Sequence, residues 1–309
     1  MKLLTCIKKF IANPVIRMGY LSKLGFYDHM GDERYLKKRF KVLMGKDLNL
    51  ENPQTFNEKL QWLKLHDRKP EYTVMVDKYK VRDYIAQVLG PEYLIPLLGV
   101  WNDPSEIDFD ALPNQFVLKC NHNSSTGLCI CKDKSKLDIG LVKRELSKAL
   151  KEDFYLHGRE WPYKNVPRRI IAEKYMEDSS SSAPGGVGQL TDYKVFVFEG
   201  KPYCIQVDFD RFINHRRNLY DVNWNYLPFT TNYPTDPNHV IKKPDSLEEL
   251  LAAAEKIARS LNNPHFVRTD FYIIDGHIYF GEITFYHGCG MVQFYPQEYD
   301  YKLGELIKI

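Results

Sequence analysis

The residues best suited to chemistry lie in two predicted C-terminal strands, 267–274 and 277–285. Odd positions of both strands are mostly apolar. Even positions carry polar or charged side chains: Arg268, Asp270, Glu282 and Thr284. Because side chains alternate between the faces of a strand, one face is apolar and the other carries functional groups. Such carboxylates can hold Mg²⁺ beside substrate phosphates. The alternative is a solvent-facing surface with an Arg–Glu cross-strand pair.

The turn between these strands decides whether the two carboxylates meet. A two-residue turn at Asp275 and Gly276 would put Asp270 and Glu282 on opposite faces. A three-residue loop over 274–276, with Gly276 in the left-handed position of a bulge, would put both on one face. The second register also gathers the apolar residues, so we expect it to be selected by burial.

A polar loop between two short predicted strands suits phosphate binding. Lys119 lies at the end of strand 116–120, the loop covers 121–127, and strand 128–131 follows. Backbone N–H groups and hydroxyls of such a loop can cover a triphosphate, with Lys119 as a charge clamp. Taken alone, the pattern also fits a surface lysine beside a flexible loop.

Two further positions combine charge with a strand or helix end. Asp77 and Lys78 begin a predicted helix and Arg82 lies one turn on, which is typical of a solvated helix face. Glu173 lies near the end of strand 168–175, where a carboxylate and backbone groups can meet a base edge. An ordinary exposed strand end is the alternative.

Lys194 alternates with apolar neighbours in strand 193–198, so it faces either a cleft or solvent.

The elements that must position these residues are mixed. Residues 1–90 are mostly helical, with a capping box at Thr55 and Glu58 and a second helix over 73–89. Later segments predict helices and strands in no regular βαβ order, which favours α+β lobes. The later predicted helices are 141–152 and 246–261, and Ser246 caps the second. Strand 202–207 is also predicted, and a flexible Ser/Gly-rich loop covers 179–188.

Composition excludes several classes of protein. The 309 residues are 44% hydrophobic and 27% charged with a formal charge of +3, which argues against disorder and a dedicated nucleic-acid binder. Six cysteines without a CxxC pair argue against a zinc site or a disulfide framework.

The N-terminal twenty residues do not form a signal peptide or a membrane span. They fit an amphipathic helix at a lipid surface or a solvated terminal helix packed on the domain, and we favour the second.

Together these residues resemble the ATP-grasp superfamily of carboxylate–amine ligases, and most closely its TupA-like members associated with polysaccharide and capsule synthesis. Each phrase alone is weak, but their order over roughly residues 45–300 is specific. The phrases that carry the likeness are residues 48–65, Asp77-Lys78, residues 116–122, residues 171–175, Asp192-Tyr193-Lys194, and Arg268-x-Asp270 with Gly281-Glu282-Ile283-Thr284.

The resemblance implies an ATP site between two α+β lobes. Arg268 and Lys119 would act in catalysis, and Mg²⁺ would bind Asp270, Glu282 and Thr284. The nucleotide would contact Lys78, Lys119, Ser124, Ser125, Thr126, Gly127, Glu173, Lys174, Tyr175 and Lys194. Two features depart from the family: the phosphate loop holds only one glycine, Gly127, and Thr284 stands where asparagine is common.

The resemblance also implies domains and partners. A helical region over 1–90 would precede ATP-grasp lobes over 91–309, with a nucleotide-loop lobe at 115–178 and a metal-binding lobe at 189–309. The enzyme would be cytoplasmic, at the inner face of the cell membrane. It would join a carboxylate on a glycan or lipid-linked precursor to an amine through an acyl phosphate.

Two other functions stay open. A glycosyltransferase could hold a metal with the D-x-D at 208–210, although the same pattern at 108–110 shows how common it is. A non-catalytic module would bind ATP without turnover, or not bind it.

Overall fold

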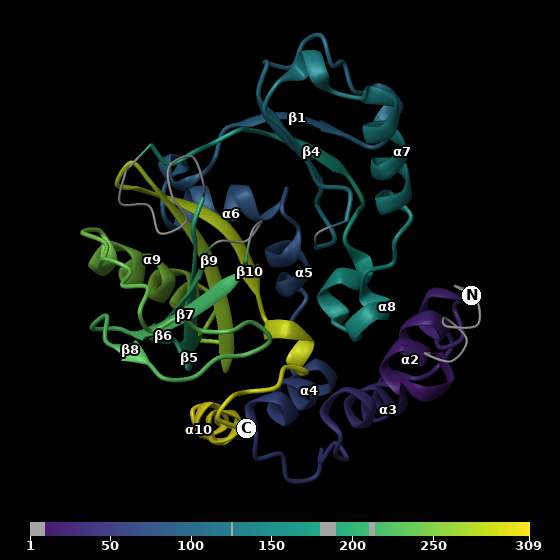
Figure 1. The fold of residues 1–309 in the computed structure, drawn as a ribbon, viewed down its shortest axis with the longest axis vertical. Coiled ribbons are helices and arrows are strands. Elements are labelled where there is room, and N and C mark those ends of the chain that lie inside the picture. The colour runs from purple at the N-terminus through teal and green to yellow at the C-terminus, as the bar shows by residue number, and fades with distance from the viewer. Residues whose placement is uncertain (1–9, 125, 180–189, 210–213) are drawn as a thin grey trace.

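The structure is a computed structural model that describes residues 10–124, 126–179, 190–209 and 214–309. Its strands form two antiparallel sheets, a small upper one and a large lower one (Figure 1). The small sheet has the order β1-β4-β2-β3, with β1 (Leu97–Trp101), β2 (Phe116–Cys120), β3 (Cys129–Cys131) and β4 (Ile170–Lys174). The large sheet has the order β10-β9-β5-β6-β7-β8, with β5 (Asp192–Phe198), β6 (Lys201–Phe209), β7 (Arg216–Asp221), β8 (Tyr226–Leu227), β9 (Phe266–Ile274) and β10 (His277–Thr284). The expected α+β class is therefore confirmed.

Helices surround both sheets, and none of those described combines the length and apolar character needed to span a bilayer. The α-helices are α2 (Pro14–Lys23), α3 (Asp32–Met44), α4 (Phe56–His66), α5 (Glu71–Val76), α6 (Val81–Val88), α7 (Ile139–Leu150), α8 (Tyr155–Gly158), α9 (Leu247–Ser260) and α10 (Glu298–Glu305). Short 3₁₀ turns are η1 (Pro91–Tyr93), η2 (Pro104–Glu106), η3 (Lys134–Lys136), η4 (Trp161–Asn165) and η5 (His287–Gly290).

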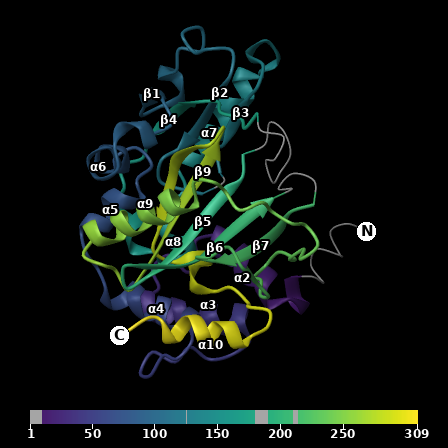
Figure 2. The same ribbon diagram turned by 90° about the vertical axis from the view of Figure 1, so that its left-hand side faces the viewer.

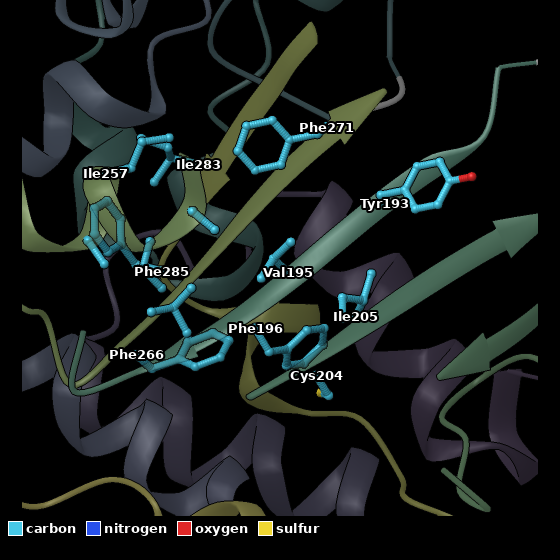
Figure 3. Packing of buried hydrophobic residues seen from close by; sticks show 14 of the residues in the cluster. Tyr193, Val195, Phe196, Cys204, Ile205, Ile257, Phe266, Phe271, Ile283 and Phe285 are labelled. Atoms are coloured by element: carbon cyan, nitrogen blue, oxygen red, sulfur yellow. The ribbon is translucent and has the colours of Figure 1, made fainter. Parts of the chain in front are cut away.

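The large sheet is covered on both faces. Its odd positions in β5, including Val195, pack with β6, β9, β10 and α9 around Ile257 (Figure 3). At the lower end of the other face, Phe56 of α4 packs edge-on against Phe266, which pairs with Phe198 across the strands. Apolar burial thus fixes one face completely and the other in part, which leaves the rest of that face for polar residues.

The small sheet has its own core, in which α7 packs on β2 through Leu146. In the second view this lobe stands above the large sheet, and α9 lies along the front of that sheet (Figure 2). Helices α4, α5 and α6 share the core of the large sheet, so much of the N-terminal third is packed against the C-terminal half.

The β9–β10 hairpin places Asp270 and Glu282 on one face, as expected, but with a different turn. Ile274 pairs with His277, so the turn has two residues, Asp275 and Gly276, both with positive φ. The predicted three-residue loop is therefore wrong. A bulge at Gly281 shifts the register further along, between Phe280 and Glu282.

Beyond this bulge the two carboxylates are direct neighbours. Glu282 pairs with Asp270, and Thr284 pairs with Arg268, so all four side chains share one face. The sequence contains the reason, because buried Ile278, Phe280 and Ile283 can share the apolar face only if a residue is added between the last two.

The predicted helix over 73–89 is broken into α5 and α6. The Asp77 side chain accepts hydrogen bonds from the backbone N–H groups of Tyr79 and Lys80 (2.8 and 3.2 Å), and the Lys78 N–H donates to the Asn121 carbonyl (3.1 Å). An aspartate that bonds to nearby backbone competes with the helix, and this explains the break.

Other sequence predictions agree to within a few residues. The capping box of Thr55 and Glu58 is present. Ser246 precedes α9 but makes no side-chain capping bond, which corrects its expected role. The five described cysteines are free, whereas Cys6 and most of the 179–188 stretch lie outside the described residues.

Candidate active site

Arg268 is the centre of the polar face. Its guanidinium binds both oxygens of Asp270 through Nε and Nη2 (2.6 and 2.7 Å). Nη2 also donates to Glu282 Oε1 (3.1 Å) and to Thr284 Oγ1 (3.3 Å). Asp270 and Arg268 are both buried away from water, so each charge depends on the other for compensation.

Lys194 extends this network across β5. Its Nζ lies 3.0 Å from Asp270 Oδ2 and 3.1 Å from Asp192 Oδ2, with Asp208 at 3.9 Å. Burial opposes its charge, but the surrounding carboxylates outweigh burial and raise the pKa of Lys194. Lys194 is therefore a permanent cation facing the site, and not a solvent-facing residue.

Glu282 connects the large sheet to Lys78. Its Oε2 lies 3.6 Å from Lys78 Nζ, which also donates to the Asn123 carbonyl (2.8 Å). Burial alone would raise the pKa of Glu282, but Lys78 and Arg268 lower it to about 2. Lys78 thereby contacts both the loop after β2 and the β10 carboxylate.

A second ionic group lies on the small sheet. Glu173 of β4 binds Lys119 Nζ at 2.5 Å and Arg82 Nη1 at 3.3 Å. Arg82 also donates to the Ile95 carbonyl (2.7 Å), so its predicted solvated position is wrong. Glu173, expected beside a base, is held by these two cations.

Asn121 joins the two lysine-bearing segments. Its side-chain Nδ2 donates to Asp77 Oδ1 (2.7 Å) and to the Pro167 carbonyl (2.9 Å), and its Oδ1 accepts from the Arg169 N–H (2.7 Å). The residue is fully buried. We call Asp77 and Asn121 the Asp77–Asn121 clamp, and sequence reasoning missed it although both residues lie in the quoted phrases.

The loop after β2 is arranged around Glu152. The Asn123 amide donates to Glu152 Oε2 (3.2 Å), and the Thr126 hydroxyl donates to the same oxygen. Gly127 has a positive φ, and a Cβ there would lie 2.5 Å from the Ala149 Cβ of α7. Ser124 is exposed, and Ser125 lies outside the described residues.

Lys174 and Tyr175 follow Glu173 at the strand end. The Lys174 N–H already donates to the Pro96 carbonyl (2.9 Å), and Lys132 Nζ lies 5.6 Å from the Tyr175 ring centroid. The Lys174 side chain is exposed.

His287 in η5 is a further neighbour, and the hydrogen-bonding role expected for it from the sequence is present. Arg268 Nη1 lies 2.9 Å from His287 Nδ1, and burial holds the pKa of this histidine well below its usual value. A neutral imidazole therefore accepts from the guanidinium, and η5 is tied to the polar face.

The family model described as TupA-like ATPgrasp matches residues 58–308. This chain belongs to the TupA-like ATP-grasp family. A search of curated proteins finds no match.

Solved structures similar to this ATP-grasp chain include two ligases. D-alanine–D-alanine ligase from Bacillus anthracis is 19% identical, with a TM-score of 0.39 over 68% of this chain and 57% of that chain. L-amino acid ligase from Bacillus licheniformis is 13% identical, with a TM-score of 0.45 over 82% and 55%. The chain thus spans little more than half the length of these structures.

The donor chemistry of this ATP-grasp chain fits Mg²⁺. Asp270, Glu282 and Thr284 carry hard oxygens, the ligand type that Mg²⁺ prefers, and Arg268 binds all three side chains in this structure. Within the described ranges, His, Cys, Asp and Glu side chains form no group of three or more suited to a metal, so carboxylates alone do not complete a site.

The D-x-D segments have other partners. Asp208 binds Arg217 Nε (2.7 Å), while Asp210 lies outside the described residues. Asp108 Oδ1 accepts from the Asp110 and Ala111 N–H groups in a local turn. Neither observation favours a nucleotide-sugar site.

Proposed function

We propose that this protein is an ATP-dependent carboxylate–amine ligase that forms an amide on a cell-surface polysaccharide or its lipid-linked precursor. The observation that carries the proposal is the continuous network from Lys78 through Glu282, Arg268 and Asp270 to Lys194. Family membership supports the same activity.

The reaction has two steps. A carboxylate oxygen attacks the γ-phosphorus of ATP, so an acyl C–O–P linkage forms and the bond to ADP breaks. An amine then attacks the acyl carbon, the C–N bond forms, phosphate leaves and the nitrogen loses a proton. Activation is needed because a carboxylate is anionic and has no leaving group.

The residues would divide this work by charge. Lys78 and Lys119 would hold phosphate oxygens, and Arg268 would stabilise charge on the moving phosphoryl group. Asp270, Glu282 and Thr284 would hold Mg²⁺, which neutralises phosphate charge when bound. Lys194 would keep Asp270 ionised and in place.

Two segments of the small-sheet lobe complete the proposed nucleotide site, one for adenine and one for the phosphates. Glu173 with the segment Lys174–Tyr175 would border adenine, with Ser124–Gly127 as the lid over the phosphates. The lobes at 115–178 and 189–309 would enclose the nucleotide, with 1–90 as the helical region.

The acid substrate would be a uronic or amino-acid carboxylate, and the reaction would take place at the cytoplasmic side of the cell membrane.

Substitution of the carboxylates tests the proposal. Asp270→Asn and Glu282→Gln should lower Mg²⁺-dependent ADP release at least about a hundredfold with a panel of uronic acids and amino acids. Asp245→Asn is the matched control, because that side chain is almost fully exposed. Thermal unfolding and circular dichroism of each variant show whether the fold is kept.

Normal turnover by folded Asp270→Asn and Glu282→Gln would refute the metal assignment. Release of a nucleotide from a sugar donor would favour a glycosyltransferase, and ATP binding without turnover on any acid–amine pair would favour a binding module.

A further inference from the structure

Large apolar side chains are exposed together on α2 and the turn after it. We call Tyr20, Leu24 and Phe26 the α2 patch; Val15 is also exposed, but it lies on the opposite side of the helix from Leu24. Leu24 and Phe26 are 79% and 69% exposed. Of the sixteen exposed large hydrophobic residues among those described, five lie between residues 11 and 26, and three of these five form the α2 patch. Single exposed apolar residues are normal, but a concentration of this kind marks an interaction surface.

The fold does not need this patch. The inner side of α2 is held on α3 by Met18, which packs with Tyr27 and Tyr35 in a separate small core. Tyr20 and Leu24 are four residues apart and so lie on one side of the helix, turned away from Met18. In Figure 1, α2 lies at the periphery of the molecule, outside α3 and away from the large sheet. Packing therefore accounts for only one side of the helix.

The charge around the patch is mainly positive. Residues 1–44 contain ten Lys and Arg but three Asp and Glu, and the first acidic residue is Asp28. The whole chain has an excess of only three positive charges, so the remainder is acidic. Lys23 is exposed in the last turn of α2, and Lys38 Nζ lies 5.6 Å from the Tyr27 ring centroid, next to Phe26. Cations thus border the apolar side chains.

We propose that the α2 patch docks on an anionic lipid bilayer, so that α2 is both packed on the domain through Met18, as favoured from the sequence, and in contact with lipid on its outer side. Apolar side chains would enter the interface while Lys23 and Lys38 meet anionic headgroups, a combination that binds peripheral helices to membranes. A second copy is a poorer occupant, because a two-fold contact would bring this basic surface against itself. The proposal does not depend on the ligase activity, since membrane binding needs no nucleotide.

Co-sedimentation of the full chain with vesicles tests the proposal. The protein should sediment with vesicles of equal parts phosphatidylglycerol and phosphatidylcholine, and much less with phosphatidylcholine alone. Leu24→Ser with Phe26→Ser should weaken binding about tenfold or more, because two large side chains no longer enter the interface. Lys23→Gln should weaken it about fivefold, and added salt should weaken it further. Val240→Ser with Ile309→Ser, exposed apolar positions outside the patch, is the matched control.

Three results would overturn the proposal. They are equal binding to the two kinds of vesicle, unchanged binding by the Leu24 and Phe26 variant, and a dimer in size-exclusion chromatography that this variant converts to a monomer. Circular dichroism of the variant, together with its unchanged ATP affinity, separates loss of docking from loss of fold.

Discussion

Single residues on the polar face are organised as alternating charges. Arg268 lies between Asp270 and Glu282, and Lys194 lies between Asp270 and Asp192. Loss of one member leaves its buried partner uncompensated, which costs more than the pair contributes when intact. These residues are consequently coupled, and their substitutions should not be additive.

Acid stability should report the charge of Glu282. Its pKa of about 2 lies below the usual 4.5, because Lys78 and Arg268 outweigh the effect of burial. A lowered carboxyl pKa stabilises the native state above pH 4.5, and that stabilisation is lost as the pH falls from 4.5 toward 2. Urea unfolding at several pH values should show this decline, with a smaller slope for Glu282→Gln. Identical slopes for both proteins would contradict the assignment.

At the scale of elements, the sequence predicted the strands better than their registers. The alternation of residues 267–285 correctly put Asp270 and Glu282 on one face, but the turn at Asp275 was mistaken. Alternation is a local property, whereas a bulge depends on what each neighbour must bury. The break at Asp77 was missed because the apolar stripe over 73–89 does not reveal the bonds from the Asp77 side chain to the Tyr79 and Lys80 N–H groups.

The Asp77–Asn121 clamp should control ATP affinity through the two lysines beside it. Asn121→Asp would place two carboxylates in contact, so it should weaken ATP binding about tenfold and lower the free energy of unfolding by about 2 kcal/mol. The exchange Asp77→Asn with Asn121→Asp restores a donor between the two positions. It should recover part of both losses, measured by calorimetric titration and urea unfolding.

A double variant no better than Asn121→Asp alone would show that the Asp77 contact does not carry the effect. In that case the bond of Asn121 to the Pro167 carbonyl would be the one that matters.

At the scale of the molecule, contacts between distant segments hold the lobes and helices together. Lys64 of α4 is fully buried, and its Nζ donates to the carbonyls of Gly158 and Cys289 (both 2.7 Å) and to Gln61 Oε1 (3.0 Å). Burial lowers the pKa of Lys64. One side chain thus joins α4, the end of α8 and η5, the turn that also carries His287.

Lys64→Met should lower the free energy of unfolding by about 3 kcal/mol, because the carbonyls of Gly158 and Cys289 and the Gln61 Oε1 each lose a hydrogen bond to the buried ammonium. Lys37→Met, at an exposed pair with Glu33, should change it by less than about 0.5 kcal/mol. Urea unfolding measures both. An equal change in the two variants would show that the buried ammonium is not a structural link.

The bulge at Gly281 changes which face of the sheet every later residue of β10 occupies. Deletion of Gly281 would turn Glu282 and Thr284 toward the apolar core on the other face of the sheet. Ile283 would then lie on the polar face beside Arg268 and Asp270. In contrast, adding or removing one residue from each strand at the tip of the hairpin would leave Asp270 and Glu282 paired. Natural variation in hairpin length should therefore accumulate at the tip, while the spacing from Asp270 to Glu282 across the bulge is kept.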